Sequence, residues 1–105
     1  MRDLLLNDTD SNVRRATASV LGRRSSHPDW ALFTALRLDS NSSVKRAALG
    51  SILRLAGISF RRVTQELKRI KSEGIQLTED EVKRIFADFG IDIPGYSDKS
   101  ADMRK

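Results

Sequence analysis

Cysteine is absent from this sequence of 105 residues, which also has a single histidine and only two prolines. Without cysteine the chain can form no disulfide framework, thiolate metal site or cysteine nucleophile, and this composition fits a reducing, cytoplasmic compartment. His27 lies in the stretch SSHPD, where its expected role is to cap the next helix, so the chain offers no set of zinc ligands. We therefore predict that the protein binds no metal or other cofactor.

Long apolar runs are missing as well. The three leucines at 4–6 are too few for the apolar region of a signal peptide. No window approaches the roughly 20 apolar residues that a membrane-spanning helix requires. We therefore predict no association with a membrane.

Motifs of catalysis are equally scarce. The sequence has no glycine-rich phosphate loop and no nucleophile elbow. The acids at 79–81 gather at the start of a predicted helix, where their charges suit the helix dipole. The stretch NDTDSN lacks the central glycine and the bidentate glutamate of a calcium loop. We predict that the protein is not an enzyme.

What the chain does contain is an excess of positive charge. Lys and Arg number 19 against 14 Asp and Glu, which gives a net charge of +5, and the isoelectric point is near 10.1. This balance raises the question of a nucleic-acid partner, although a solvated basic surface explains it equally well. The length and the hydrophobic content of 39% fit one small domain.

The apolar residues recur at spacings of three and four, whereas the alternating pattern of strands is almost missing. The chain is therefore expected to be all-α. Helices are predicted for the last turn at 1–6, over 11–24, from Pro28 to the DSNSS cluster, over about 42–56, over 60–73, and from Thr78 to Gly90.

Local signals mark the ends of these helices. Ser59 can cap the helix over 60–73, and Thr78 and Glu81 have the spacing of a capping box. Glycines at 57, 74 and 90 fit the left-handed position just past a helix end. The chain from 94 to 105 has no periodicity and is predicted to be a disordered tail.

The apolar stripes of the helices define an expected core. Leu49 and Leu53 widen the stripe of the helix over 42–56, which predicts that this helix is covered on two sides. The core is also expected to contain Trp30, Phe33, Phe60, Phe86 and Phe89, with Ile91 and Ile93 folded back on it.

One phrase occurs twice, 31 residues apart: DTDSNVRRATASVLG at 8–22 and DSNSSVKRAALGSIL at 39–53. Asp, Val, a basic residue, Arg and Ala keep their positions, and Leu5 and Leu36 lie at the same offset upstream. A repeat of about 30 residues with two helices is typical of a helical solenoid, in which each hairpin buries its apolar face on its neighbours.

The two copies resemble the second-helix signature of HEAT-like repeats, of the short type related to phycobiliprotein lyases: an Asp-rich turn, Val-Arg, small residues and Leu-Gly. The resemblance covers roughly residues 4–57 and implies a short right-handed solenoid of helical hairpins. EDEVKRIFADFG repeats Val-Lys-Arg without the leading Asp, and we interpret it as a divergent last hairpin.

We therefore expect a single repeat domain over 1–93, with repeats at about 4–27 and 28–57 and a divergent hairpin at 58–93. The first repeat lacks most of its first helix, so the apolar face of the helix over 11–24 is expected to be open on one side. A neighbouring domain, a second subunit or the upstream part of a longer repeat array would cover this face.

The basic pairs of the two copies suggest two roles. Equivalent residues of a solenoid stack in columns, so Arg14 and Lys45 are expected to pair with the turn acids Asp8 and Asp39 in a ladder between repeats. The resemblance implies the same role for these residues.

The second residue of each pair is the better candidate for a partner. The resemblance implies that the second helices line a concave face, and guanidinium groups in a groove can hold phosphates or carboxylates. The predicted binding residues are Arg15, Arg46, Arg84, Arg23 and Arg54, with Arg24 beside them. FRRVTQELKRIK forms a second basic cluster that includes Arg61 and Arg62, for which a solvated face is the alternative.

From these features we expect a non-catalytic module that mediates protein–protein interaction, as a scaffold, through the groove of its second helices. The alternative is nucleic-acid binding through a basic concave groove. A third reading, an accessory subunit of a bilin-type lyase, comes from the resemblance alone.

Overall fold

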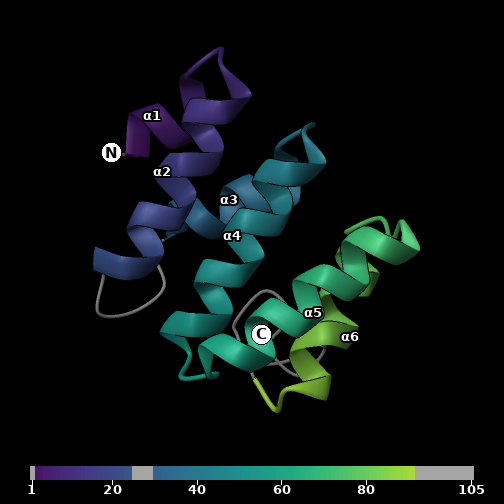
Figure 1. Ribbon diagram of the computed structural model, residues 1–105. Helices are drawn as coiled ribbons and strands as arrows, with labels where there is room; N and C mark the ends of the chain where they lie inside the picture. The colour runs from purple at the N-terminus through teal and green to yellow at the C-terminus, as the bar shows by residue number, and fades with distance from the viewer. Residues whose placement is uncertain (1, 25–29, 92–105) are drawn as a thin grey trace, which may run out of the picture.

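The computed structural model describes residues 2–24 and 30–91, and within these ranges the chain is helical apart from short turns and contains no strand. The predicted all-α class is confirmed. The described helices are α1 (Arg2–Asn7), α2 (Ser11–Arg24), α3 (Trp30–Leu38), α4 (Ser42–Leu55), α5 (Phe60–Glu73) and α6 (Glu79–Asp88) (Figure 1). None of them is long and apolar enough to cross a bilayer.

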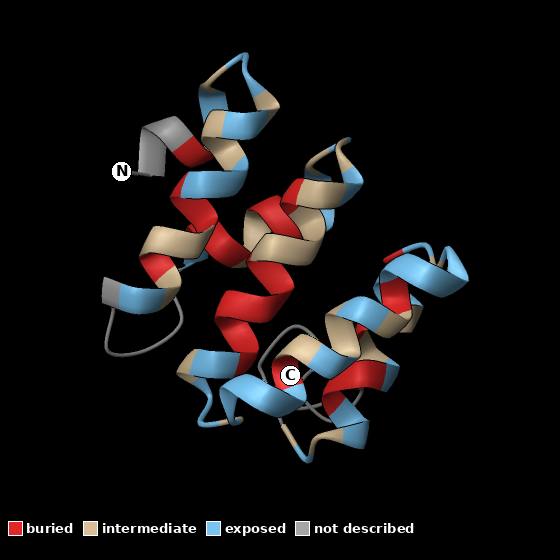
Figure 2. Ribbon diagram, in the orientation of Figure 1, coloured by how far each residue is buried: buried red, intermediate tan, exposed pale blue. Residues whose placement is uncertain are grey.

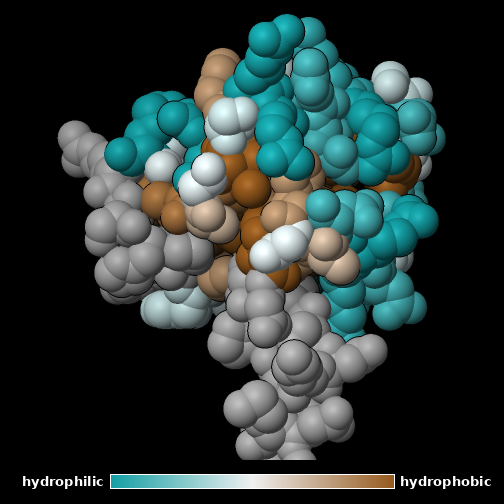
Figure 3. Space-filling model, turned by 90° about the horizontal axis from the view of Figure 1, so that it is seen from below, coloured by the Kyte–Doolittle hydropathy of each residue, from teal (hydrophilic) through white to brown (hydrophobic). Residues whose placement is uncertain are grey.

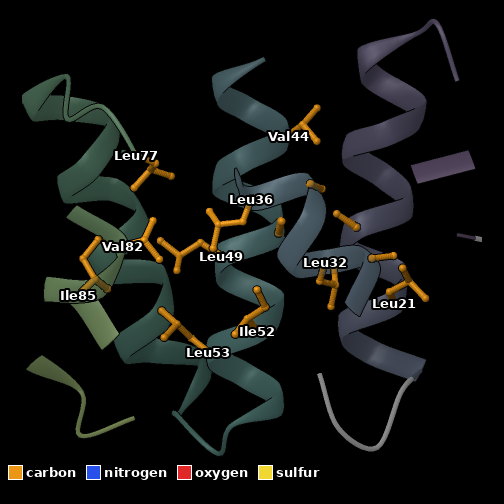
Figure 4. Close-up of a cluster of buried hydrophobic side chains, with 14 of the residues drawn as sticks. Leu21, Leu32, Leu36, Val44, Leu49, Ile52, Leu53, Leu77, Val82 and Ile85 are labelled. Carbon is orange, nitrogen blue, oxygen red and sulfur yellow. The ribbon is translucent and has the colours of Figure 1, made fainter. Parts of the chain in front are cut away.

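The helices stand in three pairs side by side, α1 with α2, α3 with α4, and α5 with α6 (Figures 1 and 4). α2 and α4 run in the same direction and contact each other along their lengths, while α1 and α3 pack behind them. α5 runs in the opposite direction to α4 and packs beside it, in the same layer as α2 and α4. α6 lies behind α5, with its first turn next to the end of α3.

Buried side chains continue through all three pairs (Figures 2 and 4). α4 is buried on two sides, as predicted, because it lies between the first and last pairs. Its residues Leu49, Ile52 and Leu53 are completely buried. Burial of each such side chain stabilises the fold by about 1.5–3 kcal/mol relative to exposure. The other helices add Leu5, Leu32, Leu36, Val82, Ile85 and Phe86.

The helix ends follow the local signals of the sequence. The Ser59 side chain accepts a hydrogen bond from the Arg62 N–H, and Gly57, Gly74 and Gly90 all have positive φ. The capping box at Thr78 is only half formed. The Thr78 side chain accepts a hydrogen bond from the Glu81 N–H. The Thr78 N–H, however, donates to the carbonyl of Gln76 and not to the Glu81 side chain.

The two copies of the repeated phrase form the same hydrogen bonds in their turns. The Asp8 carboxylate accepts from the Asp10 N–H at 2.8 Å, and Asp39 accepts from the Asn41 N–H at 2.9 Å. The side chains of Asp10 and Asn41 in turn accept from the first turns of α2 and α4. These side chains satisfy N–H groups that the helices leave without a partner.

Two aromatic residues assigned to the core are exposed instead. Trp30 and Phe60 keep 56% and 64% of their surface in solvent. Each is the first residue of its helix, and the positions that face the core are taken by their neighbours. Phe86 is buried as predicted, and Phe33 and Phe89 pack against the core with partial exposure.

The short helix α1 contacts both α2 and α3, and its Leu5 is completely buried. Val13 and Val20 of α2 keep partial exposure. Ile91 packs against the core, as expected. His27, Pro28, Ile93 and the tail at 94–105 lie outside the described residues, as does the side chain of Arg24.

Candidate functional site

A groove lies on the face that α2, α4 and α5 share, and we call it the basic groove. It consists of two adjoining hollows, one of about 610 Å³ and one of about 170 Å³. The two hollows share the lining residues Ser19, Ala47, Thr64 and Leu67, so they form one continuous depression.

Small residues create the groove. α2 turns Ala16, Ser19 and Gly22 toward it, and α4 turns Ala47 and Gly50. Within each helix these residues recur at a spacing of three, which places them on one face. Because none of them carries a long side chain, the space between α2 and α5 over α4 stays open.

The floor of the groove is fixed by a close approach of α2 to α4. The buried Ser51 hydroxyl donates a hydrogen bond of 2.7 Å to the Ala18 carbonyl, across the two helices. A methyl group at Gly22 would lie 2.9 Å from the Ser51 Cα, so only glycine permits this spacing. The spacing of α2 and α4 at the groove is therefore set by Gly22 and by the buried hydrogen bond of Ser51.

Four cations line the larger hollow: Arg15 of α2, Arg46 of α4, and Lys68 and Lys71 of α5. No carboxylate is among the described residues that line it. Within residues 2–24 and 30–91, none of the four forms an ion pair, and Arg46 only donates to the Ser43 hydroxyl at 3.0 Å. No acidic side chain of the described residues compensates their mutual repulsion, and this favours an anionic ligand.

The smaller hollow is less charged. Gly22, Gly50 and Val63 line it, with the exposed ring of Phe60 at its edge. The Arg54 guanidinium lies over that ring, 5.0 Å from its centroid. The face of the molecule where α4 ends and α5 begins shows apolar side chains in its middle, with hydrophilic ones above and to the right of them (Figure 3).

The structure brings four of the predicted binding residues to the groove. Arg15 and Arg46 line the larger hollow, and Arg23 and Arg54 line the smaller one.

The remaining three predicted binding residues lie elsewhere. Arg84 belongs to α6, which lies behind α5, and it pairs with Glu81, which raises its pKa through their hydrogen bond. Arg62 lies over the Phe89 ring at 4.8 Å from its centroid, and Arg61 is exposed outside both hollows. Arg84 does not line the groove with Arg15 and Arg46, because α5 and not α6 forms the third wall.

Lys68 and Lys71 are the groove residues that the sequence did not identify. The sequence assigned them to a separate basic cluster with Arg69. The structure divides that cluster: Arg69 pairs with Glu66 and Glu73 on the other side of α5. The spacing of Thr64, Lys68 and Lys71 on one helical face was the available signal, but it does not say which face meets α4.

The ladder residues lie at the turn end of the helices. Arg14 donates to both carboxylate oxygens of Asp39, from Nε at 2.8 Å and Nη2 at 3.2 Å, and to the carbonyl of Asp8 at 2.7 Å. The hydrogen bond to Asp39 raises the pKa of Arg14. Arg14 thus joins the first pair of helices to the turn of the second.

Lys45 reaches in the same direction, but among the described residues it contacts no carboxylate. Its Nζ lies 3.5 Å from the Arg37 carbonyl and 3.4 Å from the Leu77 carbonyl. In the turn of the third pair, Leu77 lies at the position that Asp39 has in the second, since each lies five residues before the first valine of the next helix. This turn therefore offers Lys45 a backbone oxygen in place of a carboxylate. The predicted pairing of Lys45 with a turn acid is therefore wrong.

No group of three or more His, Cys, Asp or Glu side chains in the described ranges is placed to hold a metal ion. No family model, curated protein or solved structure significantly matches the chain.

Proposed function

We propose that this protein is a non-catalytic HEAT-like repeat module, a short solenoid of helical hairpins, which binds an acidic segment of a partner protein in its basic groove. The observation that carries the proposal is the set of four cations from three helices that line one hollow, where none of the described lining residues carries a carboxylate. Carboxylates of a partner would pair with these charges.

The repeat architecture is supported by the matching turns. Asp8 and Asp39 accept equivalent hydrogen bonds, and Arg14 and Lys45 each reach from one helix pair to the turn of the next. The third pair departs from the pattern, because its first helix, α5, lies on the side of the second helices α2 and α4. We regard this reversal as the way in which the last pair closes the groove.

The composition of the floor favours a protein over a nucleic acid. Ala16, Ala47 and Leu67 lie among the cations of the larger hollow. Apolar side chains of a partner can pack on these residues, whereas a sugar–phosphate backbone gains little from them. An α-helix is about 10–12 Å wide, which suits a depression between α2 and α5 with only α4 beneath it.

The experiment compares two anionic probes. A fluorescent peptide of about 15 residues with several glutamates, and a duplex DNA of about 15 base pairs, are titrated with the protein by anisotropy at about 50 and 150 mM salt. The peptide is expected to bind at both concentrations. The double substitution Arg15→Glu with Lys68→Glu should weaken binding of the peptide by about tenfold or more, because two attractive charges become repulsive.

Arg37→Glu with Arg61→Glu is the matched control. Both arginines are exposed and neither lines the groove, yet the net charge changes by the same amount. Equal loss in the two double variants would show that only net charge matters and would contradict the proposal. Binding of the duplex alone, with a steep dependence on salt, would replace it with nucleic-acid binding.

A further inference from the structure

The geometry points to a ligand in two parts: an amphipathic helix of the partner that carries an aliphatic anchor for the smaller hollow and acidic residues two turns away for the cations of the larger hollow. This inference rests on the proposed function and specifies the partner's chemistry. It follows from the different linings of the two ends of the basic groove.

The smaller hollow has the character of an anchor site. Its volume of about 170 Å³ compares with the cavity of about 150 Å³ that accepts a benzene-sized guest, so it admits one side chain of the size of leucine. Gly22, Gly50 and Val63 form its walls. Apolar anchors in such pockets carry much of the affinity of protein interfaces.

Phe60 gives the anchor site its outer wall. Phe60 keeps 64% of its surface in solvent, which is unfavourable for an aromatic ring. The Arg54 guanidinium lies over the ring and holds it beside the hollow. An aliphatic side chain in the hollow would pack against the ring and remove part of it from water.

The distance between the two ends is similar on two walls. Arg15 precedes Gly22 by seven residues on α2, and Phe60 precedes Lys68 by eight on α5. At 1.5 Å per residue these separations correspond to about 10–12 Å. α5 runs opposite to α2, so Arg15 and Lys68 lie at one end of the groove, and Gly22 and Phe60 lie at the other.

A ligand helix spans this distance in about seven residues, which returns its side chains to the same face after two turns. Its acidic residues would therefore meet Arg15, Arg46 and Lys68 while its anchor enters the hollow beside Phe60. The small residues of the floor allow its backbone to come close.

The test uses designed peptides. A labelled helical peptide of about 15 residues carries three glutamates and, about seven residues further along, one leucine on the same face. A second peptide carries the same residues in reverse order, so that both directions of the ligand helix are tested. The peptide that binds more tightly serves as the reference. Leucine→alanine in the reference should weaken binding by about tenfold, and so should moving the leucine by two residues, which turns it away by about 200°.

The protein variant Phe60→Ala should weaken the leucine peptide by severalfold and leave the alanine peptide unchanged. Leu38→Ala is its control, since Leu38 is 75% exposed on α3 and lies outside the groove. Both residues are on the surface, so both variants are expected to fold, and circular dichroism checks this. The same method should show a gain of helix in the bound reference peptide.

The outcomes separate the inference from the proposed function. Equal affinity of the leucine and alanine peptides, or binding without a gain of helix, would overturn the two-part helical ligand while acidic binding in the groove stands. If neither peptide binds, both fail. If only a duplex DNA competes for the groove, the partner is a nucleic acid and both fail as well.

Discussion

Replacing Gly22 by alanine places a methyl group at the point where α2 touches α4. The added Cβ would lie 2.3 Å from the Ser51 Oγ, 2.5 Å from its Cβ and 2.9 Å from its Cα. The last of these atoms belongs to the backbone of α4, so a change of rotamer cannot relieve the clash. The two helices must move apart, and the buried hydrogen bond from Ser51 to the Ala18 carbonyl is stretched.

The magnitude follows from three contributions. Overpacking of this kind costs about 1–3 kcal/mol, and loss of the Ser51 hydrogen bond costs about 1 kcal/mol. Alanine is about 1 kcal/mol better than glycine inside a helix, which offsets part of the loss. Gly22→Ala should therefore lower the free energy of unfolding by about 2 kcal/mol, measured by urea denaturation.

Gly50→Ala is the matched control. The added methyl group at Gly50 would lie 2.8 Å from Leu67 Cδ1, the end of a flexible side chain, and no backbone atom is among its nearest contacts. The gain in helix propensity should balance that contact, leaving stability within about 1 kcal/mol of wild type. Equal midpoints for Gly22→Ala and Gly50→Ala would refute the reasoning about the floor of the groove.

A second substitution tests the cause. Ser51→Gly removes the two closest atoms, so Gly22→Ala should cost less in that background than in wild type. A fully additive double variant would show that the loss arises elsewhere.

Three further predictions concern stability, each measured by the urea midpoint. Leu36→Ala should lower the free energy of unfolding by about 2–5 kcal/mol because Leu36 is completely buried. Leu38→Ala on the same helix should change it by no more than about 0.5 kcal/mol. Similar losses in the two variants would contradict the assignment of the core. Asp39→Asn should lower the midpoint, because Arg14 loses the carboxylate that its guanidinium contacts with two nitrogens, and an unchanged midpoint would argue against the link. Gly74→Ala should cost about 1–2 kcal/mol, since φ is 65° there, and a stabilised variant would contradict the left-handed helix end.

Much of the fold could be predicted because its signals are local. Ser59, Thr78 and the glycines past the helix ends act through hydrogen bonds and φ values within one turn. The repeated phrase also identified the contact of Arg14 with Asp39, since both residues recur at one offset. Such features depend little on how distant elements pack.

The placement of α5 could not be predicted in this way. Both α5 and α6 carry an apolar stripe, and which of them joins α2 and α4 depends on the packing of the whole third pair. Because α5 packs there, Lys68 lines the groove and Arg84 does not. Trp30 and Phe60 were assigned to the core for a related reason: hydrophobic spacing does not reveal that the first residue of a helix points outward.

The central claim is that the cations of the basic groove recognise acidic side chains of a partner. The most direct measurement is the anisotropy of the labelled acidic peptide with three proteins: wild type, Arg15→Glu with Lys68→Glu, and Arg37→Glu with Arg61→Glu. We predict that the groove variant binds about tenfold or more weakly than wild type, while the control variant stays close to wild type. The same loss in both variants, or no binding by the wild-type protein at about 50 mM salt, would contradict the account.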